Sequence, residues 1–566
     1  MKKALRTMVS VVLAAGMMGC SSGSPSGTTP TAEAGSSAPA ETAQSTESHH
    51  PSTVTIAVFS QFTSMDPATN GELVNGYLLH HMYRGLYRMD ENSQPQMELA
   101  TAHDISEDGL IHTFTLRDDA KWSDGTPVTA NDFVYSYLRA LSYGVDASNP
   151  IYNMTTFIKG AEEYSLNALE VGNSFDCTTE DHSSVGIEAA DDHTLVLTLK
   201  SPCTYLNTSL CSGAWLPVHQ STPQHESTWA LQGGYPSNGD HVLTEMNPND
   251  KAVMVKNEYF YDKDKVTMDE IIWQVVPDTE AQHLAFQAGD IDIATSITSD
   301  VAKSYKGTDE LWVGLQTNTY CLTFNSGATG PEWAQNLNLR RAVAMAIDQK
   351  AVADVVGGEE FYPVLSSYMP LGLEGVDGDF RKERDEEGGY TLVYNPEESK
   401  RLLAEEGYDE NNPLKIEYYY STNSIHNDVA TCLQQMWSAV GIETTFKAVE
   451  SGVYYEAWYN GDFEISRYGV ALNHPVTALN TFTTNYQRVA RIGDAKYDEM
   501  VADIQATIDP KEAIRKCHAA EDYLVDEMAY IVPMFQFTLP MLRNPALTGT
   551  QINGAYLNFS QCTWTE

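Results

Sequence analysis

The sequence from Thr53 to Glu566 contains no low-complexity linker. A body of this length exceeds one small domain, and chains of this size form several compact units. Because no linker marks a boundary, we expect the domains to exchange several chain crossings, an arrangement that suits a hinge. No fixed-period repeat is visible, which argues against a solenoid.

The N-terminus has the order of an export signal. Three cations, Lys2, Lys3 and Arg6, precede the apolar stretch Met8–Met18, which is too short to span a bilayer as a helix. The following Met17–Cys20 segment looks like a lipobox, in which the cysteine is diacylated and becomes the mature N-terminus. An ordinary signal peptide with an incidental cysteine is the alternative.

We therefore predict a signal peptide over residues 1–19, and a lipidated Cys20 with a tether over residues 20–52. The tether consists mainly of Ser, Thr, Pro, Ala and Gly, a composition that cannot bury apolar area. No later apolar run reaches the roughly 18 residues of a membrane-spanning helix. We expect the body to lie outside the membrane, held to it by the lipid.

The charge balance excludes nucleic acid as the main partner. Lys and Arg together number 34 and Asp and Glu 77, for a formal net charge of −43. Binding to a phosphate backbone relies on cationic side chains, which are in deficit here.

Hydrophobic patterns predict an α/β protein with mixed sheets. Alternation predicts strands at 53–59, 113–117 and 193–199, and a helix is expected from Ala130, with Thr129 as its N-cap and Asp132 at the third helical position. Further helices are predicted at 339–347 and after the cap-proline pairs 395–396 and 509–510. Strands at 414–420 and 444–448 flank a helix through Cys432, which is a βαβ-like order.

Catalytic motifs are missing. The sequence contains no GxxxxGK[ST], HExxH, GxGxxG or CxxC pattern, so we predict no cofactor, no metal site and no enzyme activity. His80 and His81 are interpreted as surface histidines, because neighbouring residues on a helix do not face one site.

Aromatic residues supply pocket candidates. Tyr454 and Trp458 lie between two glycines and combine apolar area with a polar group, so they suit either a pocket wall or core packing. The triplet Tyr418–Tyr420 is interpreted as core, since alternate residues of a strand point to opposite faces.

One long segment, residues 105–136, looks like the pattern FxLRxxxKWSDGxPVTAxDFVYS almost throughout. Further matches lie at 324–348, 394–407 and 520–533. On these segments the chain, from Thr53 to its end, resembles the extracytoplasmic solute-binding proteins, family 5, of oligopeptide and dipeptide ABC transporters.

The resemblance implies a two-lobed periplasmic-binding-protein type II fold with mixed sheets and an extra inserted domain. Lobe I is expected from residues 53–66, 190–318 and 526–566, the inserted domain from 67–189, and lobe II from 319–525. It also implies a lipid-anchored, extracytoplasmic monomer that captures oligopeptides between closing lobes. The peptide then passes to the ABC permease, while the partner ATPase subunits bind ATP.

Site residues carried over from the resemblance are the Asn238-Gly239 turn and the loop that begins with Arg467 and Tyr468 and includes Asn473. In peptide binders this loop usually supplies an Asp for the ligand's α-amino group. Here no carboxylate lies between Arg467 and Pro475. Two alternatives stay open for the role of this Asp: Asn473 takes it, or an acid elsewhere, such as Glu450 or Glu456, does.

Two further functions stay open. The same fold could bind a non-peptide solute, such as a metal chelate or a glycan fragment, which the missing loop Asp would favour. An exported hydrolase using paired carboxylates such as Asp118-Asp119 is the third hypothesis, although adjacent acids usually mark solvated turns.

Overall fold

The computed structural model describes residues 52–90, 94–143, 152–224, 227–469, 471–484, 492–553 and 556–565. These residues belong to one compact unit. The predicted signal peptide, Cys20 and the tether up to residue 51 lie outside the described residues. In the part of the chain that is described, no helix is long and apolar enough to cross a membrane.

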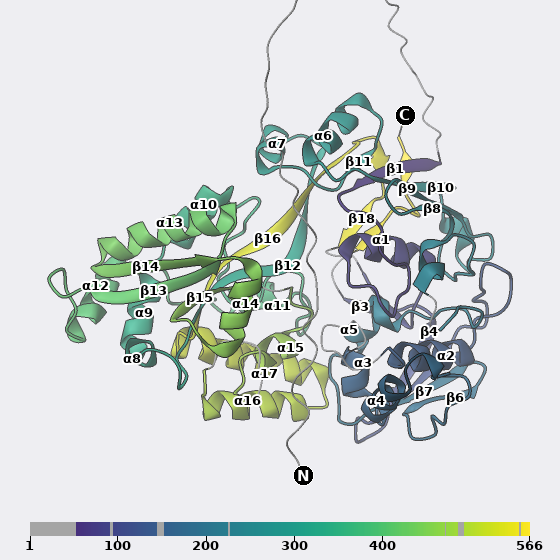
Figure 1. Cartoon of the computed structure of the whole chain (residues 1–566), viewed down its shortest axis with the longest axis horizontal. Coiled ribbons are helices and arrows are strands. Elements are labelled where there is room, and N and C mark those ends of the chain that lie inside the picture. The colour runs from purple at the N-terminus through teal and green to yellow at the C-terminus, as the bar shows by residue number, and fades with distance from the viewer. Residues whose placement is uncertain are drawn as a thin grey trace, which may run out of the picture. The chain divides into compact units, whose positions relative to one another are not determined.

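A ten-stranded mixed sheet runs through the structure (Figure 1). Its strands are, in spatial order, β14 (Ile442–Val449), β13 (Leu414–Ser421), β15 (Ile465–Tyr468), β12 (Leu311–Phe324), β16 (Ile531–Arg543), β11 (Ile293–Ala294), β1 (Thr53–Val58), β10 (Glu270–Val275), β9 (Lys251–Lys256) and β8 (His241–Asn247). The predicted first strand is confirmed, and it lies inside the sheet, parallel to β10 and β11.

Two long strands, β12 and β16, join the two ends of this sheet. They pair with each other antiparallel along most of their length, with register shifts between Leu315 and Thr319 and between Tyr320 and Cys321. The C-terminal part of β12 also pairs with β15, whereas the C-terminal end of β16 pairs with β11. The chain thus crosses between the two ends of the sheet more than once.

Smaller sheets complete the β-structure. A four-stranded antiparallel sheet has the order β4 (Ala100–Ile105), β5 (Ile111–Leu116), β7 (Thr194–Thr198) and β6 (Ile187–Asp191). Its strands β5 and β7 confirm two predicted strands. The two-stranded sheets are β2 (Tyr87–Met89) with β3 (Pro95–Met97), β17 (Leu547–Thr548) with β20 (Thr563–Trp564), and β18 (Gln551–Asn553) with β19 (Tyr556–Asn558).

The α-helices cover both halves of the described chain. They are α1 (Leu73–Met82), α2 (Ala130–Leu141), α3 (Tyr152–Phe157), α4 (Ala161–Val171), α5 (Leu206–Leu210), α6 (Thr279–Ala288), α7 (Ser299–Ser304), α8 (Glu332–Gln335), α9 (Leu337–Met345), α10 (Gln349–Val356), α11 (Phe380–Glu386), α12 (Pro396–Glu405), α13 (Ser424–Ala439), α14 (Ser451–Asn460), α15 (Pro475–Asn480), α16 (Ala495–Ala506) and α17 (Pro510–Asp522). Short turns of 3₁₀ helix lie at Gly172–Ser174, Gly213–Trp215, Ser227–Leu231 and Lys263–Lys265, and a π-helical turn lies at Tyr523–Glu527.

Local capping signals place several helix starts. Helix α2 begins after Thr129, and Asp132 closes the predicted capping box by accepting from the Thr129 backbone N–H at 2.8 Å. Asn395 and Asp509 cap α12 and α17, each ahead of a proline at the first helical position. The predicted βαβ order is confirmed, since β13 and β14 are parallel neighbours and α13 packs against β14 at the edge of the sheet (Figure 1).

Most of the buried apolar side chains divide by chain segment. One large cluster draws on residues 54–293 and 541–562, and two others draw on residues 320–535. A smaller fourth cluster joins Phe361 to Ala57, Ile291 and Leu542. The predicted inserted domain shares the first cluster with lobe I, because Tyr77 of α1 stacks on Trp273 of β10 at 6.2 Å. The domain boundaries themselves stay a prediction.

Candidate functional site

The predicted loop leaves the sheet at β15, beside the long strand β12. Arg467 is in register with Leu322, and Tyr468 with Cys321. Because successive side chains of a strand point to opposite faces, Arg467 and Tyr468 lie on different sides of the sheet.

Arg467 is a buried cation with aromatic neighbours. Arg467 is 8% exposed, and its guanidinium carbon lies 5.9 Å from the centre of the Tyr320 ring and 5.5 Å from the centre of the Tyr454 ring. Among the described residues it forms no ion pair, and its Nε has no hydrogen-bond partner. A buried charge without a counter-ion is costly, so this side chain is suited to receive an anion.

Further polar groups surround the same guanidinium. The hydroxyl groups of Tyr320 and Tyr418 form a hydrogen bond of 3.1 Å, and the centre of the His426 ring lies 5.4 Å from that of the Tyr320 ring. Burial, together with the charge of Arg467, lowers the pKa of His426 to about 3, so this imidazole is neutral. Tyr320, Tyr418 and His426 were not predicted as site residues, because they come from distant segments and no motif marks them.

An aromatic stack that includes Tyr454 packs against β15. Tyr454 and Trp458 both lie on α14 and are buried. Tyr419 stacks on Tyr454 at 5.4 Å, and Trp458 stacks on Tyr468 at 5.4 Å. Tyr454 also donates a hydrogen bond to the backbone carbonyl of Arg467. The rings therefore position the strand that carries Arg467.

The loop after β15 is attached to β12. Ala471 forms a β-bridge with Asn318, and the Leu472 N–H donates to the Thr317 carbonyl at 3.1 Å. Asn473 is exposed beside these contacts, and the next residue, His474, caps α15 by accepting from the Val476 N–H. These contacts fix the backbone at Ala471 and Leu472, while the Asn473 side chain is exposed.

The Asn238-Gly239 turn is packed against the end of α1. The Asn238 amide accepts from the Arg84 backbone N–H at 2.9 Å and donates to the Arg84 carbonyl at 3.0 Å. A Cβ on Gly239 would lie 2.1 Å from the His81 carbonyl oxygen, so only glycine fits there. Both residues shape the turn, and the Asn238 side chain is occupied by the backbone.

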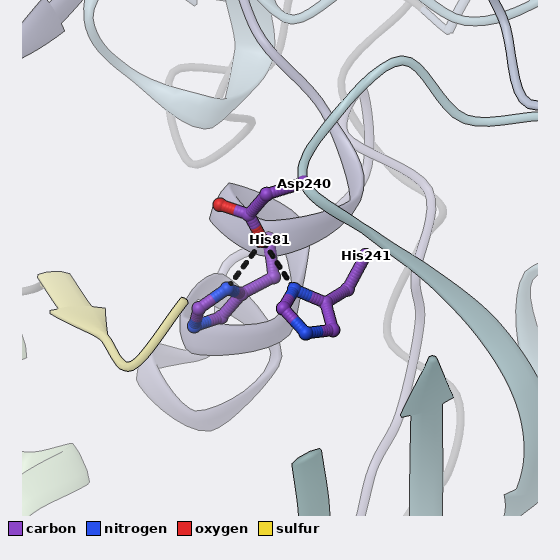
Figure 2. Close-up of side chains that lie close together, drawn as sticks. All are labelled: His81, Asp240 and His241. Carbon is purple, nitrogen blue, oxygen red and sulfur yellow. Dashed lines mark hydrogen bonds and ion pairs between the residues drawn. The ribbon is translucent and has the colours of Figure 1, made fainter. Parts of the chain in front are cut away.

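The next residue, Asp240, is the centre of a buried cluster that Figure 2 shows. It accepts hydrogen bonds from His81 Nδ1 at 2.8 Å, from His241 Nδ1 at 2.6 Å and from the Arg84 guanidinium. Burial alone would raise the pKa of Asp240, but Arg84 and the imidazoles outweigh it and hold that pKa well below its usual range.

The interpretation of His81 as a surface histidine was wrong. Its side chain is buried, and its ring lies 6.0 Å from Trp273 and 6.2 Å from Phe559. Helix α1 is apolar around most of its circumference, which is typical of a buried helix. That signal was present in the sequence and was missed.

Within the described ranges, one group of side chains could supply three metal ligands, namely His81, Asp240 and His241. The contacts shown in Figure 2 have hydrogen-bond lengths. His241 Nε2 also lies 2.9 Å from the Met268 carbonyl oxygen, so both ring nitrogens of His241 have hydrogen-bond partners within the protein. Because Arg84 compensates the carboxylate and the ring nitrogens of His241 have partners, we interpret the cluster as a structural hydrogen-bond network.

Comparisons with known proteins define the class. The family model described as "Bacterial extracellular solute-binding proteins, family 5 Middle" matches residues 94–488. The class is that of bacterial extracellular solute-binding proteins. Within it, the chain belongs to family 5, which confirms the resemblance seen in its motifs.

Relatives match over most of their length. The dipeptide-binding protein DppE of Bacillus subtilis (strain 168) is 29% identical over 496 residues, covering 86% of this chain and 87% of DppE. The periplasmic murein peptide-binding protein MppA of Escherichia coli (strain K12) is 28% identical over 500 residues, covering 87% of this chain and 88% of MppA.

Solved structures show the same fold. The unliganded open form of MppA superposes with a TM-score of 0.78 at 25% identity, covering 91% of this chain and 98% of MppA. Peptide-bound OppA of Listeria monocytogenes superposes with a TM-score of 0.64 at 24% identity, covering 92% of this chain and all of OppA. The predicted type II fold of periplasmic binding proteins is confirmed.

Proposed function

We propose that this chain is the peptide-binding component of an ABC importer and works outside the cytoplasm. Its family consists of solute-binding proteins, and relatives that match over most of the chain are named for binding dipeptides, oligopeptides and murein peptides. In this role the chain would bind its ligand between two lobes and deliver it to the permease, without changing it chemically.

The observation that carries the proposal is the buried guanidinium of Arg467. It has no ion-pair partner among the described residues, and its neighbours are tyrosine rings and a neutral histidine. A free peptide ends in a carboxylate, which a guanidinium can bind through two parallel hydrogen bonds. We therefore assign Arg467 as the residue that binds the terminal carboxylate of the peptide.

The other site residues take supporting roles. Tyr454, Trp458 and Tyr468 hold the strand that bears Arg467, and Asn473 offers an exposed amide to the peptide backbone. Extended peptides can satisfy their main-chain groups against a strand and its loop, which gives affinity for many sequences. Asn238 and Gly239 act through the turn that they shape in lobe I.

A non-peptide solute is the second candidate. One relative, 25% identical over 495 residues, is named as a probable deoxycholate-binding periplasmic protein of Escherichia coli. Deoxycholate also carries a carboxylate, so Arg467 would suit either ligand. The amino group, which a peptide has and a bile acid lacks, separates the two.

Calorimetric titration with tetra-alanine tests the proposal. We expect binding of one peptide per protein, and we expect chromatography to recover the peptide uncleaved. Deoxycholate is the matched comparison. Binding of deoxycholate without binding of tetra-alanine would support the second candidate, and cleavage of the peptide would contradict the proposal in favour of a hydrolase.

We further propose that Cys20 carries a lipid that anchors a monomeric protein to the cell membrane. The support is the lipobox-like sequence and the tether that follows it. Replacing the cysteine by serine (Cys20→Ser) should move the protein from the membrane fraction to the soluble fraction of cells, because the anchoring thioether cannot form. Unchanged fractionation of the variant would refute the anchor.

A further inference from the structure

A peptide has two charged ends, and Arg467 accounts for one of them. The loop from Arg467 to Pro475 contains no carboxylate that could pair with the amino end. If a peptide is held by both ends, the second charged group must come from another segment of the chain. This inference rests on the proposed function.

The pairing of β15 and its loop with β12 indicates how far the amino end of a bound peptide lies from Arg467. Arg467 is paired with Leu322, and Leu472 is bonded to Thr317 on the same strand. Five residues of extended strand span about 17 Å, which is the length of four or five extended peptide residues. A partner for the amino end is therefore expected near the Leu472 end of the loop.

Glu374 lies at that end. Its Oε2 is 3.7 Å from Nε2 of His474, the residue after Asn473, and accepts a hydrogen bond from the Thr208 hydroxyl at 2.7 Å. The His474 ring also stacks on Tyr205 at 5.3 Å, and Tyr205 is the residue just before α5. Glu374 thus joins the loop to a second chain segment, Tyr205–Thr208.

The Glu374 carboxylate has spare capacity for a cation. Among the described residues it pairs with no lysine or arginine, and Thr208 is its one hydrogen-bond donor. His474 does not neutralise it, because burial lowers the pKa of that imidazole to about 3. The Glu374 side chain is 22% exposed, and its burial raises the pKa of its carboxyl group, so a cation bound beside it would favour the ionised form.

We propose that Glu374 pairs with the free amino group of a bound peptide, so that Arg467 and Glu374 together select short zwitterionic peptides. A carboxylate offers about four lone-pair sites, and Thr208 uses one of them. An ammonium group can therefore bind without displacing the existing contact. Glu450 and Glu456 are exposed, and no ion pair joins either of them to the described residues of the loop.

A comparison of tetra-alanine with N-acetyl-tetra-alanine in calorimetry tests the assignment. Glu374→Gln keeps the shape of the side chain and its contact with Thr208, but removes the charge. We expect it to weaken tetra-alanine binding about 10- to 100-fold, the range of a hydrogen bond to a charged group. The affinity for the acetylated peptide should be unchanged, so the preference for a free amine should disappear.

Glu443→Gln is the matched control, because Glu443 is an exposed acid on β14. It should alter neither affinity. Equal effects of Glu374→Gln on both peptides, or no effect, would overturn the assignment, as would loss of the amine preference in Glu450→Gln or Glu456→Gln. If the unsubstituted protein binds neither peptide, the proposed function itself fails, a result distinct from an unaltered preference.

Discussion

Replacing Arg467 by glutamine is expected to weaken tetra-alanine binding about 10- to 100-fold, because a charged hydrogen-bond partner of the ligand carboxylate is lost. The affinity for tetra-alanine amide, which has no terminal carboxylate, should be nearly unchanged. The buried guanidinium lacks an ion-pair partner among the described residues, so we also expect the variant to be at least as stable in the absence of ligand. Calorimetry and thermal unfolding measure the two effects.

Lys447→Gln is the control for Arg467→Gln. Lys447 is an exposed cation on β14, which β13 separates from the strand of Arg467, and its Nζ lies 5.0 Å from the Tyr419 ring centre. Its substitution should change neither affinity. If Arg467→Gln lowered the affinities for the acid and the amide equally, or lowered the melting temperature, Arg467 would be a structural residue and not the carboxylate partner.

Replacing Asp240 by asparagine is expected to lower the free energy of unfolding by about 3–5 kcal/mol, the cost of removing one partner from a buried ion pair. Arg84 would lose its buried counter-ion, and the His81 and His241 N–H groups would face an amide that cannot accept from all of them. Urea unfolding at neutral pH measures the loss. Asp264→Asn, at an exposed acid, should change stability by less than about 0.5 kcal/mol.

The same cluster predicts acid sensitivity of the unsubstituted protein. Burial lowers the pKa of His81, so the folded state keeps this imidazole neutral while the unfolded chain takes up a proton below about pH 6.5. The pKa of Asp240 is also depressed, so its contribution is present above about pH 4 and is lost as the pH falls further. Both groups make stability decrease with falling pH. Constant stability between pH 7 and pH 5 would contradict this account of His81. Below about pH 4, Asp264→Asn should lose stability as the unsubstituted protein does, whereas an equal further loss in Asp240→Asn would contradict the account of Asp240.

Local signals in the sequence predicted much of the fold. Strand β1 follows from simple alternation, and the start of α2 follows from Thr129 and Asp132, which bond to each other. The order β13, α13, β14 follows from two strand patterns around a helical one. These predictions succeeded because each depends on neighbours within a few residues.

The candidate site could not be predicted in the same way, because it depends on contacts between distant segments of the chain. Arg467 was predicted from a resemblance, but its surroundings combine Tyr320, His426 and Tyr454, which no local pattern connects. Glu374 lies about a hundred residues before the loop that it contacts, so no spacing rule could find it. His81 shows the opposite case, since the apolar character of α1 was visible and its burial could have been predicted.

The central claim is that this protein binds peptides, and mass spectrometry of the small molecules released by denaturing the purified protein tests it most directly. We expect short peptides of mixed sequence with free amino and carboxyl ends. A single non-peptide species, such as a bile acid, or peptides without a free amine, would contradict it.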